Sequence, residues 1–292
     1  MATIAPLHLR SAIILISCPD QKGIITAVTD FVYRHQGNII DLDEHVDFGS
    51  KTFFMRIEWD MEHFSLSDDE LRAYFLRYIG TPYQMEWTLH FSDQKPIISL
   101  FVSQYLHCLY DILSRCDSGE WDVKVPLIFS NHEVGRDIAA RFGAEFHLMH
   151  ITKENKREQE QKQIQLLREH NVELVVLTRY MQILSAEFIT EFPNRIINIH
   201  HSLLPAFVGA RPYHQAFERG VKIIGATSHY VTAELDAGPI IEQDNVKITH
   251  KDSIEDMIRK GRDVEKIILA RAVRLHMQRK ILVHGNKTVV FI

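Results

Sequence analysis

Three polar residues in the second half of the sequence could together stabilise negative charge on a carbonyl oxygen. Two of them, Asn198 and His200, are separated by one residue in a short apolar run. Side chains at positions i and i+2 share one face of a strand, so the carboxamide and the imidazole should converge while Ile197 and Ile199 enter the core. The third, Asp236, stands in a turn-forming stretch that precedes another apolar run.

These residue types support acyl transfer. An amide N–H from Asn198 and a protonated His200 can hold a carbonyl oxygen as it becomes an oxyanion. A carboxylate at Asp236 would favour the charged form of the imidazole, and would orient it or position a water molecule. The pattern therefore predicts an acyl-transfer site that has no nucleophilic side chain.

Each of these residues also has an ordinary structural interpretation. The chain has 17 histidines, and a histidine on a strand is commonly hydrogen-bonded scaffolding. Asp236 and Gly238 could simply form a turn. A zinc site at His200 and His201 is disfavoured, because neighbouring side chains on a strand point to opposite faces, and we expect no metal.

The elements that must position these residues alternate between strand and helix from residue 96 to residue 285. Ile97–Val102 predicts the first strand of this α/β domain. Val172–Leu177 is apolar throughout, as is typical of a strand buried on both faces of a parallel sheet, so we place it centrally. The polar run Lys153–Gln163 is interpreted as a solvated helix face rather than an interaction tail. Ligands of such sheets bind at the carboxyl ends of the strands, where the Asn and His pair falls.

Residues 10–92 predict a smaller domain of another kind. Its strand-like and helical runs follow the order βαββαβ, the ferredoxin-like split βαβ arrangement. Ser67 and Glu70 have the spacing of a capping box at the start of its second helix. This part of the sequence holds no evident catalytic set. The polar stretch from Ser92 to Pro96 predicts the linker between the two domains.

Length and composition exclude several classes of protein. With 292 residues, 46% hydrophobic and 24% charged, the chain is an ordinary globular protein of one or two domains. The net charge is −5 without a basic block, so we expect no nucleic-acid partner. Three cysteines form neither a disulfide framework nor a C-x-x-C pair. No apolar run approaches the roughly 18 residues that span a bilayer, so we expect a cytoplasmic protein with no membrane partner.

At this point the sequence resembles a known family, the 10-formyltetrahydrofolate deformylases or hydrolases, over nearly its whole length. The segments that carry the resemblance are NIHHSLLPAFVGARPYHQAFERGVKIIGATSHYV and LDAGPIIEQD. The turn Cys18–Gly23 is similar to that of an ACT domain. The resemblance implies an ACT domain at residues 10–92, followed by a Rossmann-like formyltransferase domain with a mostly parallel sheet at residues 96–285.

The resemblance also implies the site. It assigns Asn198, His200 and Asp236 as the catalytic residues of 10-formyltetrahydrofolate hydrolysis, which yields tetrahydrofolate and formate. Formate would supply purine biosynthesis, and the reaction would balance the one-carbon folate pools. The folate is the substrate, and no cofactor is implied. The pterin is expected against a set of substrate-binding residues: Met181, Gln182, Ile183, Leu184, Thr232 and Leu235.

The alternative reaction is formyl transfer to an amine such as glycinamide ribonucleotide. A transferase of this kind needs a glycine-rich phosphate cradle after the first strand of the domain. No glycine occurs from Lys95 to Ser118. We therefore expect a narrowed acceptor pocket, lined by His107, in which water is the acceptor.

The ACT resemblance implies a homo-oligomer, a tetramer or a hexamer, whose activity responds to an amino-acid effector. An ACT domain that only assembles the subunits is the simpler alternative. A non-catalytic folate or amino-acid sensor is a further alternative, against which the intact Asn, His and Asp trio argues.

Overall fold

The computed structural model describes residues 10–205 and 212–292 and divides into two compact units. The first contains the described residues up to Gln94, and the second runs from Lys95 to Gln278. The change between them falls within the stretch that was predicted to be a linker. Residues 206–211 of the quoted motif lie outside the described residues.

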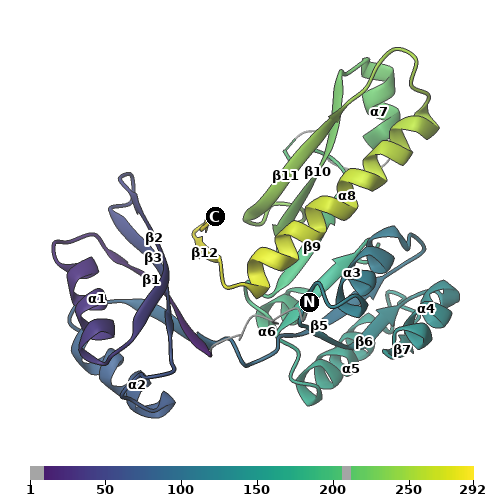
Figure 1. Ribbon diagram of the computed structural model, residues 1–292. Helices are drawn as coiled ribbons and strands as arrows, with labels where there is room; N and C mark the ends of the chain where they lie inside the picture. Colours follow the sequence, from purple (N-terminus) through teal and green to yellow (C-terminus); the bar gives the residue numbers. More distant parts are fainter. Residues whose placement is uncertain (1–9, 206–211) are drawn as a thin grey trace, which may run out of the picture. The chain divides into compact units, whose positions relative to one another are not determined.

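The first unit has the predicted βαββαβ order. Its sheet is antiparallel throughout, with the strand order β2-β3-β1-β4. Figure 1 shows both helices on one face of this sheet. The elements are β1 (Ser11–Pro19), α1 (Ile24–Arg34), β2 (Asn38–Asp47), β3 (Thr52–Asp60), α2 (Asp68–Phe75), η1 (Leu76–Gly80) and β4 (Glu86–Phe91).

Apolar periodicity and capping explain these elements. Ile14 and Ile16 of β1 are fully buried, and with Phe31 of α1 they belong to one hydrophobic core. The predicted capping box is present at the start of α2, where the Ser67 backbone N–H donates to the Glu70 carboxylate at 2.9 Å. The unit therefore forms its own core.

The C-terminal segment was not predicted to reach the first unit. It forms β12 (Ile281–His284) and β13 (Lys287–Val290), which pair with each other. Residues 279–282 and 289–292 group with the first unit, whereas the prediction assigned the chain up to residue 285 to the second. Phe291 packs against Leu15 and Phe54, so the segment covers apolar side chains that the first unit would otherwise expose to water.

The second unit contains a mixed, mostly parallel sheet of seven strands in the order β11-β10-β9-β8-β5-β6-β7. Strand β10 runs antiparallel to both of its neighbours, β9 and β11, and the other pairings are parallel. The strands are β5 (Ile97–Val102), β6 (Lys124–Ser130), β7 (Glu145–Leu148), β8 (Leu174–Thr178), β9 (Ile196–His200), β10 (Ile223–Tyr230) and β11 (Ile240–Lys247). The helices are α3 (His107–Asp117), η2 (Glu133–Gly135), α4 (Arg136–Arg141), α5 (Lys156–Glu169), α6 (Ala186–Glu191), α7 (Pro212–Arg219) and α8 (Ile254–Met277).

The central position predicted for Val172–Leu177 is confirmed, because β8 is the middle strand and all its residues are buried. Long helix α8 lies along β10 and β11 (Figure 1). No helix in the described ranges is both long enough and apolar enough to cross a membrane.

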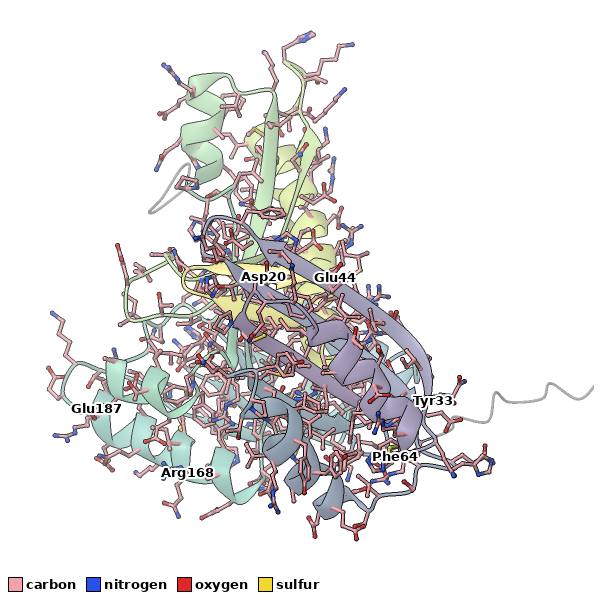
Figure 2. All side chains as sticks on the ribbon, turned by 90° about the vertical axis from the view of Figure 1, so that its left-hand side faces the viewer. Asp20, Tyr33, Glu44, Phe64, Arg168 and Glu187 are labelled. Carbon is pink, nitrogen blue, oxygen red and sulfur yellow. The ribbon has the colours of Figure 1, made fainter. Side chains whose placement is uncertain are left out.

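The polar run before β8 is part of helix α5, as predicted. Figure 2 shows Arg168 on this helix and Glu187 on α6. Most of the run is exposed, but Glu160 is 3% exposed and accepts a hydrogen bond from the backbone N–H of Ser185 at 3.0 Å. Ser185 in turn caps α6 by accepting from the Phe188 backbone N–H. The buried carboxylate thus ties α5 to the start of α6.

Candidate active site

Strand β9 carries two of the predicted catalytic residues to the carboxyl end of the parallel sheet. Ile197 and Ile199 are 0% and 3% exposed, and His200 is the last residue of the strand. Asn198 is half-buried. Both Asn198 and His200 line a cavity of about 360 Å³.

The turn between β10 and β11 brings Asp236 to the same cavity. Asp236 Oδ2 lies 3.2 Å from His200 Nδ1. The turn is tightly constrained, because a Cβ at Gly238 would meet the Tyr230 carbonyl oxygen at 1.8 Å. The carbonyl oxygen of Ala237, the residue between Asp236 and Gly238, accepts a hydrogen bond from Asn286 Nδ2 at 2.9 Å. The three predicted catalytic residues therefore meet at one cavity.

His229 is a fourth member of the site that the sequence analysis did not select. It stands opposite Asn198 in the antiparallel pairing of β10 with β9. Its Nδ1 lies 2.9 Å from the Tyr230 carbonyl oxygen, so this nitrogen carries a proton and donates it, and we assign Nε2 as the acceptor. Asn198 Nδ2 lies 3.3 Å from that Nε2 and donates to it. The second Nδ2 proton remains available to a ligand.

His200 fixes the charge of Asp236. Hydrogen bonding from His200 holds the pKa of the Asp236 carboxyl well below its usual range, so the group is a carboxylate. With Nδ1 of His200 donating to this carboxylate, Nε2 is left as the ring nitrogen available to a ligand. That Nε2 atom is buried and has no hydrogen-bond partner within residues 10–205 and 212–292. A buried polar atom of this kind at a cavity calls for a ligand.

All the predicted substrate-binding residues except His107 line the cavity: Met181, Gln182, Ile183, Leu184, Thr232 and Leu235. Three of them are large apolar side chains that are more than half exposed, with Met181 at 57%, Ile183 at 63% and Leu235 at 60%. Apolar side chains so exposed at the rim of a cavity are typical of a binding site for a flat hydrophobic ligand.

The structure differs from the expectation for His107, which is not among the described residues that line the cavity. His107 begins helix α3, and its Nε2 lies 2.8 Å from Glu265 Oε2 of helix α8. The buried carboxylate thus draws the imidazole toward α8.

One group of three side chains has the types and spacing of metal ligands. Donor atoms of His107, Cys108 and Glu265 lie within 4.8 Å of one another. Burial raises the pKa of the Cys108 thiol well above its usual value. The Glu265 carboxylate already accepts hydrogen bonds from His107 and from Tyr213. This chemistry does not suit a metal centre.

His201 also lines the cavity, although strand alternation predicted the opposite face. Strand β9 ends at His200, so the alternation does not extend to its neighbour. The ring centroids of His200 and His201 are 5.3 Å apart. Burial, together with the nearby Arg179, lowers the pKa of His201 to about 4, and the ring is therefore neutral at pH 7.

Comparison with known proteins fits this arrangement. Residues 97–273 match the family described as formyl transferase. The formyltetrahydrofolate deformylase of Synechocystis sp. is 54% identical over 281 residues, which cover 96% of this chain and 98% of that protein. The chain belongs to the formyltetrahydrofolate deformylase family.

Solved structures agree with this membership. A formyltetrahydrofolate deformylase from Pseudomonas syringae has a TM-score of 0.95 at 44% identity, covering 98% of this chain and 96% of that one. A glycinamide ribonucleotide transformylase from Symbiobacterium toebii has a TM-score of 0.64 at 32% identity and covers 70% of this chain and 98% of that one. The deformylase resemblance thus extends over both units, whereas the transformylase covers less of the chain.

Proposed function

We propose that this member of the deformylase family hydrolyses 10-formyltetrahydrofolate to tetrahydrofolate and formate, with Asn198, His200 and Asp236 as its catalytic residues. The observation that carries the proposal is the unpartnered Nε2 of His200, whose Nδ1 is held by the Asp236 carboxylate. None of the described residues that line the cavity is a serine or a cysteine, and the hydroxyl of Thr232 donates its proton to the Glu234 carbonyl oxygen. The arrangement therefore suits attack by water rather than by a nucleophilic side chain.

The pterin would lie against the exposed apolar side chains of Met181, Ile183 and Leu235, as a flat heterocycle requires. The formyl group would then reach the Asn198 carboxamide and the His200 imidazole. Backbone groups of the segments that carry these apolar residues can hydrogen-bond the edge of the heterocycle.

Each group would have one task in the reaction. Nε2 of His200 takes a proton from the attacking water, and the free Nδ2 proton of Asn198 stabilises the oxyanion that forms on the formyl oxygen. The Asp236 carboxylate stabilises the charged imidazole. The tetrahedral intermediate then collapses as His200 returns the proton to N10 of the folate, which releases formate.

Product analysis tests this function. Purified protein incubated with 10-formyltetrahydrofolate and no added acceptor should release formate and tetrahydrofolate in equal amounts. Adding glycinamide ribonucleotide should not change the rate or divert the formyl group. Turnover that depends on the added amine would show that the protein is a transferase.

We also propose that the first unit is an ACT domain that regulates a homo-oligomer, a tetramer or a hexamer, in response to an amino acid. The support is its βαββαβ order with the strand order β2-β3-β1-β4. Edge strand β2 exposes Ile39 at 37% and Ile40 at 55%, which suits pairing with a second copy.

Glycine and methionine, added separately to the activity assay and to an equilibrium binding assay, test the regulation. If neither amino acid binds and neither changes the rate, subunit assembly would remain as the role of the first unit.

We place the reaction in the cytoplasm, where the formate would supply purine biosynthesis and the hydrolysis would balance the one-carbon folate pools.

A further inference from the structure

A buried cluster of charged side chains borders the cavity through Arg179, and the three proposed catalytic residues do not account for it. Arg179 lines the cavity with its side chain only 10% exposed. It follows strand β8, whose parallel neighbour β9 ends at His200. His200 and His201 line the same cavity, and burial together with the charge of Arg179 lowers the pKa of His201. The guanidinium is therefore part of the wall of the cavity that holds the His200 imidazole.

Arg179 is held on two sides. Its Nε lies 3.5 Å from Glu265 Oε2, and its Cζ lies 5.4 Å from the centroid of the Tyr105 ring. Glu265 is 1% exposed and is itself fixed by two hydrogen bonds. His107 Nε2 lies 2.8 Å from one of its carboxylate oxygens, and the Tyr213 hydroxyl donates to the other at 2.8 Å.

The charges in this cluster are complementary. Burial alone would raise the pKa of the Glu265 carboxyl, but His107 and Arg179 together lower it, so the group is a carboxylate. Burial, and the carboxylate beside it, raise the pKa of Tyr213, so the phenol keeps the proton that it donates. Tyr213 can approach this closely because residue 261 is glycine, where a Cβ would meet the Tyr213 hydroxyl oxygen at 2.0 Å. Tyr213 and helix α8 are therefore in close contact at Gly261.

Two of the holding side chains, Tyr105 and His107, come from the segment after β5. A phosphate-binding transferase would need open glycine backbone in this segment. Here the side chains of the segment point instead to Arg179 and Glu265. The segment after β5 thus carries side chains that hold Arg179 and Glu265 in place of open glycine backbone.

The backbone of Arg179 is unfavourable for an arginine. Its φ is +65°, in the left-handed region that favours glycine. Its Nε forms no hydrogen bond with any residue that the structure describes. Neither backbone preference nor hydrogen bonding of Nε accounts for the arginine, whereas its bulk and positive charge at the cavity wall do.

We propose that Arg179, anchored by Glu265, is a specificity-determining residue that restricts the formyl acceptor to water. This proposal rests on the hydrolytic function proposed above. A water molecule needs little room beside the guanidinium, but an amine must also bring its carbon substituents to the same place. The positive charge of Arg179 further disfavours any protonated amine.

The two competing reactions differ only in the nucleophile. In hydrolysis the bond from the formyl carbon to N10 breaks, a bond to the water oxygen forms, and a water proton ends on N10. In transfer the formyl carbon bonds to the amine nitrogen, and an amine proton ends on N10. The ratio of formylated amine to formate therefore measures acceptor choice without any other reagent.

Arg179→Gly tests the proposal, because glycine suits the backbone at this position and removes the wall. With 10-formyltetrahydrofolate and either glycinamide or glycinamide ribonucleotide, the ratio of formylated amine to formate should rise about tenfold or more over the wild-type ratio, as for loss of other steric exclusions. Arg179→Lys keeps the positive charge and most of the side-chain volume, so this variant should retain the wild-type ratio. Asn171→Gly is the matched control, because Asn171 is exposed, has a φ of +52° and does not line the cavity.

Glu265→Gln is the second variant, in case Arg179→Gly does not fold. It keeps the shape of the anchor but removes the negative charge that holds Arg179, so the ratio should rise by a smaller factor. Unchanged ratios in folded variants would overturn the proposal while leaving hydrolysis intact. Wild-type protein that releases no formate without an amine would instead refute the proposed function, so the two failures are distinguishable.

Discussion

Asp236 Oδ2 lies 3.2 Å from Nδ1 of His200, although one residue stands in the turn after β10 and the other ends β9. This contact sets the direction in which the imidazole can act. Because Nδ1 donates to the carboxylate, Nε2 is the nitrogen left for a water molecule or a formyl oxygen at the cavity. A contact between two segments that are distant in sequence thus leaves one nitrogen of the His200 ring available at the cavity.

Asp236→Asn should lower kcat about 100-fold or more and leave KM nearly unchanged. The carboxylate acts mainly on the charged imidazole of the transition state, and general acid–base groups contribute effects of this order. Steady-state kinetics with 10-formyltetrahydrofolate measures both constants. Asp244→Asn is a matched control, because Asp244 lies on β11 in an exposed pair with Arg271 and should retain wild-type kinetics. A rise in KM with kcat preserved would mean that Asp236 binds substrate instead.

His229→Leu should reduce kcat about tenfold, because misplacing a substrate-positioning group has effects of at least this size. The variant loses the acceptor that holds the Asn198 carboxamide, so the second amide proton no longer points reliably to the oxyanion. His214→Leu, at an exposed position on α7, is the control. Equal kcat values for the two variants would remove His229 from the site.

The neutral His201 makes stability depend on pH. Its folded-state pKa is about 4, below the value of about 6.5 for an unfolded histidine. Between these two values the unfolded chain binds more protons than the folded one, so this residue makes the free energy of unfolding rise with pH from about 4 to about 6.5. Above about pH 6.5 the contribution of His201 to the free energy of unfolding is constant. This contribution is lost as the pH falls toward 4.

Urea unfolding of wild type and His201→Asn over this pH range measures the contribution of His201. The wild-type curve should be the steeper of the two between pH 4 and 6.5, and the curves should run parallel at higher pH. Parallel curves throughout would mean that burial does not perturb this histidine.

Gly238→Ala should destabilise the protein by about 1 to 3 kcal/mol, the usual cost of forcing atoms into a filled space. The added methyl group would meet the Tyr230 carbonyl oxygen and must displace the turn that carries Asp236. The urea midpoint measures stability, and kcat should fall with it. Gly49→Ala, in an exposed turn, is the control, and an equally small effect of both substitutions would contradict the account of this turn.

How much the sequence predicts depends on whether a feature is local. The alternation at Asn198 and His200 and the turn at Asp236 are local patterns, and the structure brings these three residues together. His229 was missed because its role follows from the antiparallel register of β10 on β9, which no local pattern specifies. The available signal was that His229 lies within the segment that carries the family resemblance.

The remaining differences have the same origin. The expectation for His107 followed from its place after the first strand of the domain, but a buried carboxylate on α8, far along the chain, binds its imidazole. Residues 279–282 and 289–292 group with the first unit, where Phe291 packs on Leu15 and Phe54. In both cases the deciding partner is distant in sequence.

A crystal structure with a non-reactive 10-formyl folate analogue would show whether Asn198 and His200 meet the formyl group. We expect the formyl oxygen within hydrogen-bond distance of Asn198 Nδ2, with a water molecule between the formyl carbon and His200 Nε2. The pterin should cover Met181 and Leu235. A formyl group bound away from both Asn198 and His200 would refute the proposed roles of these two residues.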